Sequence, residues 1–134
     1  MAAIFAYGTL KQHEERGTCW PRKPLSITPA FVRGSLYNLG EYPALVAGDD
    51  WVSGECWLIA DEDLPITLQV LDEIECYAKQ DDDLYERVVI DCYQTADINT
   101  PHHRVFTYYY LHPAHLRDTN RIRPNAAGVC AWSA

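Results

Sequence analysis

The chain has 134 residues, 48% of them hydrophobic, which is enough for one domain with a buried core, so we expect residues 1–134 to form a single domain. Its net charge of −8 at pH 7 argues against nucleic acid and anionic membranes as partners. No stretch approaches the roughly 18 apolar residues of a membrane span, and no basic segment precedes an apolar run at the N-terminus as in a signal peptide.

The short apolar run of residues 2–6 predicts a buried strand, which ends in Tyr7-Gly8-Thr9-Leu10. Because glycine has no Cβ, a ligand can approach the backbone closely at this point. Successive N–H groups in such a turn can form a concave nest for a carboxylate or a phosphate. We therefore treat residues 7–10 as a candidate anion site, with an ordinary turn as the alternative. A short helix could follow at residues 12–15.

Four further segments alternate in polarity or are rich in β-branched and aromatic residues, as strands are. These segments are residues 30–37, 51–60, 85–93 and 104–111. Gly34 suggests a bulge or close packing within the first of them. Residues 40–44 predict a turn, and residues 48–50 predict a hairpin-type connection into the strand that begins at Trp51.

One helix is predicted from Leu64 to Glu75. Pro65 suits a helix start, and the acidic residues 61–63 suit the positive end of the helix dipole. Five or more strands with one or two helices indicate an α+β fold. We expect a small twisted sheet or β-barrel with one or two flanking helices.

Glu75 is the unusual residue of this helix. At 100° per residue it falls among Leu64, Leu68 and Leu71, in the middle of the stripe that should face the core. A carboxylate there must be paired, protonated or functional, because an unpaired buried charge is costly. Burial would raise its pKa and make it a better base at neutral pH. The alternative is that the helix frays at Ile74 and Glu75 turns to solvent.

The strand that follows carries a second charged residue on an apolar face. Tyr85, Arg87 and Val89 share one side of residues 85–93. An arginine in this setting needs an acidic partner. Glu75, Asp72 or a ligand carboxylate could serve.

Other types of site are disfavoured. A zinc site needs three or four convergent ligands, and no element carries them at a suitable spacing. Ser-His-Asp order, a G-x-S-x-G elbow and glycine-rich phosphate loops are absent, so we expect no metal and no cofactor. The cysteines are odd in number and include no C-x-x-C, which favours reduced thiols in a cytoplasmic protein. They are Cys19, Cys56, Cys76, Cys92 and Cys130.

The loop Tyr7-Gly8-Thr9-Leu10 and the helical Glu75 together resemble the gamma-glutamylcyclotransferase-like superfamily, in its small single-domain, AIG2-like branch. Further segments resemble the family in the same order. These are residues 34–44, 54–57, 71–77 and 84–87. The resemblance covers most of residues 4 to 90, and no part of it extends beyond Leu111.

The resemblance implies a small mixed barrel with flanking helices and a cavity. It also implies a reaction on a small γ-glutamyl substrate, whose α-amine attacks its own γ-carbonyl to release an amine or amino acid and leave 5-oxoproline. The family's catalytic acid/base matches Glu75, and its substrate-binding loop amides match residues 7–10. We add the hypothesis that Tyr85 and Arg87 shape and polarise the site and that Tyr37 and Tyr42 line the cavity mouth.

Two other functions remain open at this point. The same fold could bind a small carboxylate without catalysis, or Glu75 could activate water in an amide hydrolase. The presence of a carboxylate at this position favours the cyclotransferase over the binding protein, which has no need of a base. The sequence carries no signal for the oligomeric state.

Overall fold

The computed structural model describes residues 2–75, 77–78, 83–95 and 101–133. Within them five strands close into a barrel, in the order β1-β5-β4-β2-β3, with β3 pairing back to β1. The strands are β1 (Ala2–Ala6), β2 (Ser26–Asn38), β3 (Pro43–Ile59), β4 (Tyr85–Tyr93) and β5 (Pro101–Tyr110). The β1–β5 pair is parallel and the other pairs of the ring are antiparallel. The predicted α+β fold, a mixed barrel, is confirmed.

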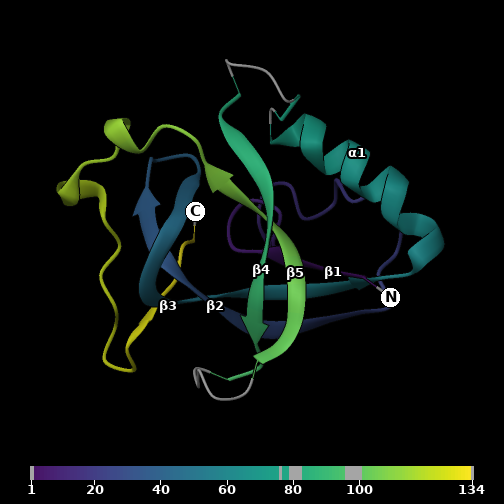
Figure 1. Cartoon of the computed structure of the whole chain (residues 1–134), viewed down its shortest axis with the longest axis horizontal. Coiled ribbons are helices and arrows are strands. Elements are labelled where there is room, and N and C mark those ends of the chain that lie inside the picture. The colour runs from purple at the N-terminus through teal and green to yellow at the C-terminus, as the bar shows by residue number, and fades with distance from the viewer. Residues whose placement is uncertain (1, 76, 79–82, 96–100, 134) are drawn as a thin grey trace.

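The helix α1 (Leu64–Ile74) lies along one side of the barrel (Figure 1). A 3₁₀ turn, η1 (Asp61–Asp63), precedes it and contains the acidic residues expected at the helix start. The short strand β6 (Val129–Cys130) pairs with the edge of β3, and the C-terminal segment lies on the side of the barrel away from α1. Two 3₁₀ turns, η2 (Pro113–His115) and η3 (Asp118–Asn120), lie between β5 and β6.

The strand β1 is buried on both faces, which explains its continuous apolar sequence. Ala3 and Phe5 belong to one core cluster together with Val32 and Val52 of β2 and β3. Ile4 and Ala6 belong to a second cluster, which the helix joins through the fully buried Leu71. The carboxyl end of β1 is therefore held firmly where the loop of residues 7–10 begins.

The chain reverses between β2 and β3 at residues 39–42. Gly40 has a φ of +100° there, and the Leu39 N–H donates to the Tyr42 carbonyl at 3.0 Å. The hairpin predicted at residues 48–50 is wrong, because these residues continue β3. Val46 pairs with Ser35 and Asp50 pairs with Gly34. The strand β3 therefore pairs with β2 both before and after residues 47–49, and these residues form a bulge and no turn. The irregularity predicted at Gly34 is confirmed.

The other elements follow the sequence closely, with one exception. The strand predicted at residues 85–93 is β4, and the predicted helix has the expected start and ends one residue earlier. The short helix suggested at residues 12–15 is wrong. This segment forms turns, closed by hydrogen bonds such as Glu14 N–H to Lys11 O at 3.0 Å, because so short a segment cannot repay the cost of helix nucleation.

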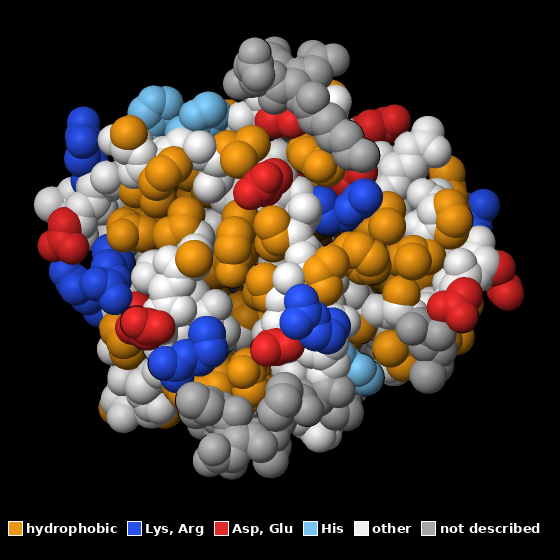
Figure 2. Space-filling model, viewed as in Figure 1, with side chains coloured by type: hydrophobic (Ala, Val, Ile, Leu, Met, Phe, Trp, Pro, Cys, Tyr) orange, Lys and Arg blue, Asp and Glu red, His pale blue; other side chains and the backbone are white. Residues whose placement is uncertain are grey.

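The surface combines apolar and charged side chains. On the face seen in Figure 2, hydrophobic side chains reach the surface in several patches with charged side chains between them, as is usual for a small protein. Among the described helices, none is long and apolar enough to cross a membrane. The four described cysteines are free, and Cys76 lies outside the described residues.

Gly54 of β3 is predicted to tolerate no larger residue, because the end of β1 lies against its Cα. An added Cβ would lie 2.6 Å from Cζ of Phe5 and would overlap the carbonyl oxygen of Ala6. Gly54→Ala is expected to lower the free energy of unfolding by about 1–3 kcal/mol, as overpacking does. Unfolding by denaturant measures this change in the free energy of unfolding. The control Ser53→Ala loses one hydrogen bond of 3.4 Å and should cost about 1 kcal/mol or less, so equal losses would contradict the prediction.

Candidate functional site

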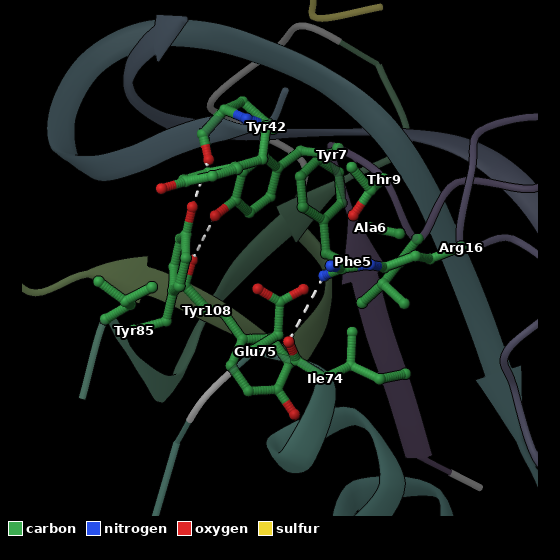
Figure 3. Close-up of a pocket in the computed structure, with 14 residues that line it drawn as sticks. Phe5, Ala6, Tyr7, Thr9, Arg16, Tyr42, Ile74, Glu75, Tyr85 and Tyr108 are labelled. Carbon is green, nitrogen blue, oxygen red and sulfur yellow. Dashed lines mark hydrogen bonds between the residues drawn. The ribbon is translucent and has the colours of Figure 1, made fainter. Parts of the chain in front are cut away.

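A cavity of about 110 Å³ lies where the carboxyl end of β1 meets the β2–β3 turn and the C-terminus of α1 (Figure 3). The start of β4 and one tyrosine of β5 complete its wall. The lining consists of residues 5–10, Arg16, Tyr42, Pro43, Ile74, Glu75, Leu84, Tyr85 and Tyr108. This is a small volume for a ligand site, and it suits the head group of a small molecule.

The cavity brings together most of the residues expected from the sequence. The loop of residues 7–10, Glu75, Tyr85 and Tyr42 all line it. Tyr37 and Arg87 lie outside its wall. Tyr37, which lies on β2, forms a β-bridge with Arg121, and Arg87 pairs with Asp72.

Two of the polar side chains in the lining, those of Tyr108 and Arg16, were not expected from the sequence. Tyr108 is one of three consecutive tyrosines, and strand alternation does not tell which side of a barrel faces a cavity. Arg16 lies in a loop, where the sequence has no periodicity that would predict the direction of its side chain. A lone arginine after the loop of residues 7–10 was the only available signal.

Glu75 points into the cavity although the helix ends before it (Figure 3). The helix does end at Ile74, but Glu75 caps it with φ −85° and ψ 7°, and its N–H donates to the Leu71 carbonyl at 2.9 Å. The backbone therefore stays close to helical for one more residue. The side chain keeps the inward direction that the helical period predicts and does not turn to solvent.

The environment of Glu75 changes its acidity. Burial raises the pKa of Glu75 from 4.5 to about 7, and the nearby cation of Arg16 opposes the shift. Glu75 is the only acidic side chain and Arg16 the only basic one among the described residues that line the cavity. The cavity thus holds a carboxyl group that exchanges a proton near neutral pH.

Three of the four tyrosines that line the cavity donate their hydroxyl hydrogen to a fixed partner in the backbone or the helix. The hydroxyl of Tyr7 donates to the carbonyl of Tyr108 at 2.7 Å, and that of Tyr85 donates to the carbonyl of Pro43 at 2.6 Å. The hydroxyl of Tyr108 donates to Oδ1 of Asp72 at 2.7 Å. Burial raises the pKa of each of these tyrosines above its usual value. They stay protonated at neutral pH and fix the shape of the wall.

The loop of residues 7–10 offers backbone N–H groups. The carbonyls of Gly8, Thr9 and Leu10 accept hydrogen bonds from Lys11 N (3.1 Å), Arg16 N (2.7 Å) and Trp20 Nε1 (3.0 Å), respectively. In the described part of the chain, the N–H groups of residues 8–10 donate none of the recorded hydrogen bonds. Unpaired N–H groups at buried positions are costly, so this loop is suited to an anionic or carbonyl ligand.

Gly8 has a second role in this loop. An added Cβ would lie 2.6 Å from Cγ of Pro43, so glycine lets the loop pack directly against the first residue of β3, just after the β2–β3 turn. The sequence suggested glycine for the approach of a ligand, and the structure adds the close approach of the turn that forms the facing wall.

Asp72 fastens the helix to the barrel one turn before Glu75. Its Oδ2 lies 2.6 Å from Nη1 of Arg87 on β4, and its Oδ1 accepts the Tyr108 hydroxyl of β5. The two side chains of the ion pair are only 23% and 21% exposed. Of the three partners that the sequence allowed for Arg87, the structure selects Asp72.

We predict that Asp72→Asn lowers the free energy of unfolding by about 1–2 kcal/mol, because it removes a charge-assisted hydrogen bond from a partly buried arginine. Thermal or denaturant unfolding measures the loss. The matched control is Asp91→Asn, whose ion pair with Arg104 is 3.4 Å long and at least half exposed. That change should cost about 0–1 kcal/mol, and a loss as large as that of Asp72→Asn would show that burial of the pair is unimportant.

The raised pKa of Glu75 predicts a pH-dependent cost to stability. The unfolded chain releases this proton near pH 4.5 and the folded chain near pH 7, so the cost grows between these values and is complete above them. Glu75→Gln cannot ionise, and it should be more stable than the wild type at pH 8 by up to about 3 kcal/mol. Below pH 4.5 this advantage should vanish.

Unfolding measured at both pH values checks this prediction. Glu73→Gln, an exposed position of the same helix, controls for removing one negative charge. A Glu75→Gln advantage that is the same at pH 4 and pH 8 would mean that the Glu75 carboxyl is not desolvated.

Comparison with known proteins shows the family and agrees with this fold. A family model described as gamma-glutamyl cyclotransferase, AIG2-like, matches residues 4–129. A gamma-L-glutamyl-butirosin B gamma-glutamyl cyclotransferase from Niallia circulans is 32% identical over 113 residues, which are 82% of this chain and 67% of that protein.

Solved structures share the fold. An AIG2-like protein from Mus musculus superposes with a TM-score of 0.58 at 20% identity, over 100% of this chain and 97% of that one. An uncharacterized protein from Pyrococcus horikoshii superposes with a TM-score of 0.60 at 19% identity, over 91% and 86% of the two chains. At these identities the likeness concerns the fold alone.

Proposed function

This chain belongs to the gamma-glutamyl cyclotransferase, AIG2-like family, and we propose that it converts a small γ-glutamyl amine or γ-glutamyl amino acid to 5-oxoproline and the free amine or amino acid. The family and the named relative indicate gamma-glutamylcyclotransferase activity. The substrate class and the role of each residue are our proposal, and its main support is the carboxyl of Glu75, which has a pKa of about 7 inside the cavity.

In the proposed reaction Glu75 carries a proton between two nitrogens. The substrate's α-ammonium group gives a proton to the Glu75 carboxylate and becomes a nucleophile. Its nitrogen attacks the γ-carbonyl carbon, a new C–N bond closes the five-membered ring, and the bond to the leaving nitrogen breaks. Glu75 gives this first proton to that nitrogen. It then takes the second proton, which the ring nitrogen must lose to become the lactam N–H, and passes it to the released amine, which leaves as an ammonium ion. A group whose pKa is near the working pH is best suited to both transfers.

The cavity holds the substrate in the curled conformation that brings its α-amine to its γ-carbonyl. Attack within one molecule already has a high effective concentration, so the protein mainly has to hold the chain curled. The walls are suited to this because the hydroxyls of Tyr7, Tyr85 and Tyr108 are tied to fixed partners. A rigid, small cavity favours the compact head group and leaves the released amine outside.

The loop of residues 7–10 is proposed to bind the substrate through its backbone N–H groups. These can hold an oxyanion at the γ-carbonyl or the α-carboxylate, and loss of one such donor commonly costs about 10²–10³ in rate. Tyr85 contributes to the wall directly. We propose that Arg87 acts through Asp72 and the position of the helix, and that Tyr37 supports β2 without touching the substrate.

We also propose a cytoplasmic location. Its support is the odd number of cysteines and the absence of a C-x-x-C spacing in the sequence, as in proteins that keep reduced thiols.

The test is product analysis with γ-glutamyl amino acids and γ-glutamylamines. The wild type is expected to release 5-oxoproline, and Glu75→Gln should lower kcat about 10²–10⁴-fold because the proton carrier is lost. Glu73→Gln, exposed on the same helix, should match the wild type. For the wild type, kcat/KM should rise with pH through about 7 as Glu75 loses its proton.

Other outcomes identify the alternatives. Free glutamate in place of 5-oxoproline would indicate an amide hydrolase in which Glu75 activates water. Ligand binding with neither product would indicate a binding protein. Full cyclising activity in Glu75→Gln would exclude the proposed proton transfer.

A further inference from the structure

Arg16 connects the N-terminal loop to the end of the helix across the cavity. Its backbone N–H donates to the Thr9 carbonyl at 2.7 Å, which ties it to the loop of residues 7–10. Its side chain lines the cavity, and Nη1 lies 3.5 Å from the Ile74 carbonyl. Figure 3 shows the guanidinium reaching toward Ile74 and Glu75 from the side opposite to Tyr85.

This contact uses little of the binding capacity of Arg16. A distance of 3.5 Å is long for an N–H···O hydrogen bond, and a guanidinium has five N–H donors. Within the described residues, no recorded ion pair includes Arg16. Arg87 differs, because Oδ2 of Asp72 lies 2.6 Å from its Nη1 and the carboxylate neutralises its charge. Arg16 is therefore the cation at this site that has donors left for a ligand.

The two charged side chains of the described lining have opposite signs and face the same cavity (Figure 3), and the Arg16 cation is near enough to lower the pKa of Glu75. A ligand that carries an ammonium and a carboxylate group on one carbon atom matches this arrangement, with the ammonium at Glu75 and the carboxylate at Arg16. Guanidinium groups bind carboxylates through short, charge-assisted and often paired hydrogen bonds.

We propose that Arg16 binds the α-carboxylate of the γ-glutamyl head group while Glu75 faces its α-amine. This inference rests on the proposed function and adds a specificity residue to it. The substrates are then γ-glutamyl compounds with a free α-carboxylate, and residues other than Arg16 recognise the leaving group. With the carboxylate at Arg16, the N–H groups of residues 8–10 bind the γ-carbonyl oxygen as it gains negative charge.

The test pairs each enzyme variant with two substrates that differ only in the α-carboxylate. γ-Glutamylmethylamide carries it, and N-methyl-4-aminobutanamide lacks it. Both release methylamine when they cyclise, the first to 5-oxoproline and the second to 2-pyrrolidone. Arg16→Gln is expected to lower kcat/KM for γ-glutamylmethylamide about tenfold or more, mainly through KM, and to leave the value for the analogue unchanged within a factor of about two.

The second substrate separates carboxylate binding from an effect on Glu75. Arg16 also influences the proton affinity of Glu75, but Glu75 performs the same transfers on both substrates. A loss that comes only from Glu75 would therefore be equal for the two, and it would overturn the proposal. No loss on either substrate would overturn it as well, and would leave the loop N–H groups as the carboxylate site.

Two variants serve as controls. Arg22→Gln makes the same change of charge in the same N-terminal segment, at a residue outside the cavity wall whose ion pair with Asp63 is 3.7 Å long. It should match the wild type on both substrates. Arg16→Lys keeps the positive charge, and it should recover part of the preference for γ-glutamylmethylamide.

A third substrate, γ-glutamylalanine, carries a second carboxylate on its leaving group, so it tests whether Arg16 binds that carboxylate. If Arg16→Gln affects γ-glutamylalanine but not γ-glutamylmethylamide, Arg16 binds the carboxylate of the leaving group and the proposal fails. A wild type that cyclises none of these substrates overturns the proposed function and this inference together. A wild type that is active, with Arg16→Gln equally active on all three substrates, overturns only the inference.

Discussion

The carboxylate of Asp72 holds the helix against two strands of the barrel at once. It pairs with Arg87 of β4 at 2.6 Å and accepts the hydroxyl of Tyr108 of β5 at 2.7 Å. Tyr108 in turn accepts the hydroxyl of Tyr7 through its carbonyl, so the loop after β1 joins the same set of contacts. Glu75 follows Asp72 by three residues, and its reach into the cavity depends on this attachment of the helix.

Burial raises the pKa of both the carboxyl and the tyrosine hydroxyls in the wall, but the result at neutral pH differs between them. It brings the pKa of Glu75 to about 7, which makes this carboxyl a proton carrier at neutral pH. It raises the pKa of Tyr85 and Tyr108 further from neutrality, so these hydroxyls act as fixed donors. One physical cause, desolvation of the charged form, thus separates the reactive group from the scaffold.

The sequence predicted the site well where a residue belongs to a regular element. The helical period predicted the inward direction of Glu75, and strand alternation predicted that Arg87 needs an acidic partner. It did not predict which acid, because three candidates were compatible with the pattern and only a distance selects Asp72. It missed Arg16 entirely, because a loop has no period. The wrong hairpin at residues 48–50 has a related cause, since a bulge and a turn share their glycine and aspartate residues.

The sequence by itself determined which segments along the chain form the main strands and the helix, the inward face that carries Glu75, and membership of the family. These follow from local chemistry, namely the alternation of polar and apolar residues and the motifs of residues 7–10 and 71–77. Only the tertiary structure decided which arginine is neutralised and which backbone N–H groups find no partner among the described residues. Both depend on distances between segments far apart in the chain, and the closure of the barrel between β1 and β3 sets those distances.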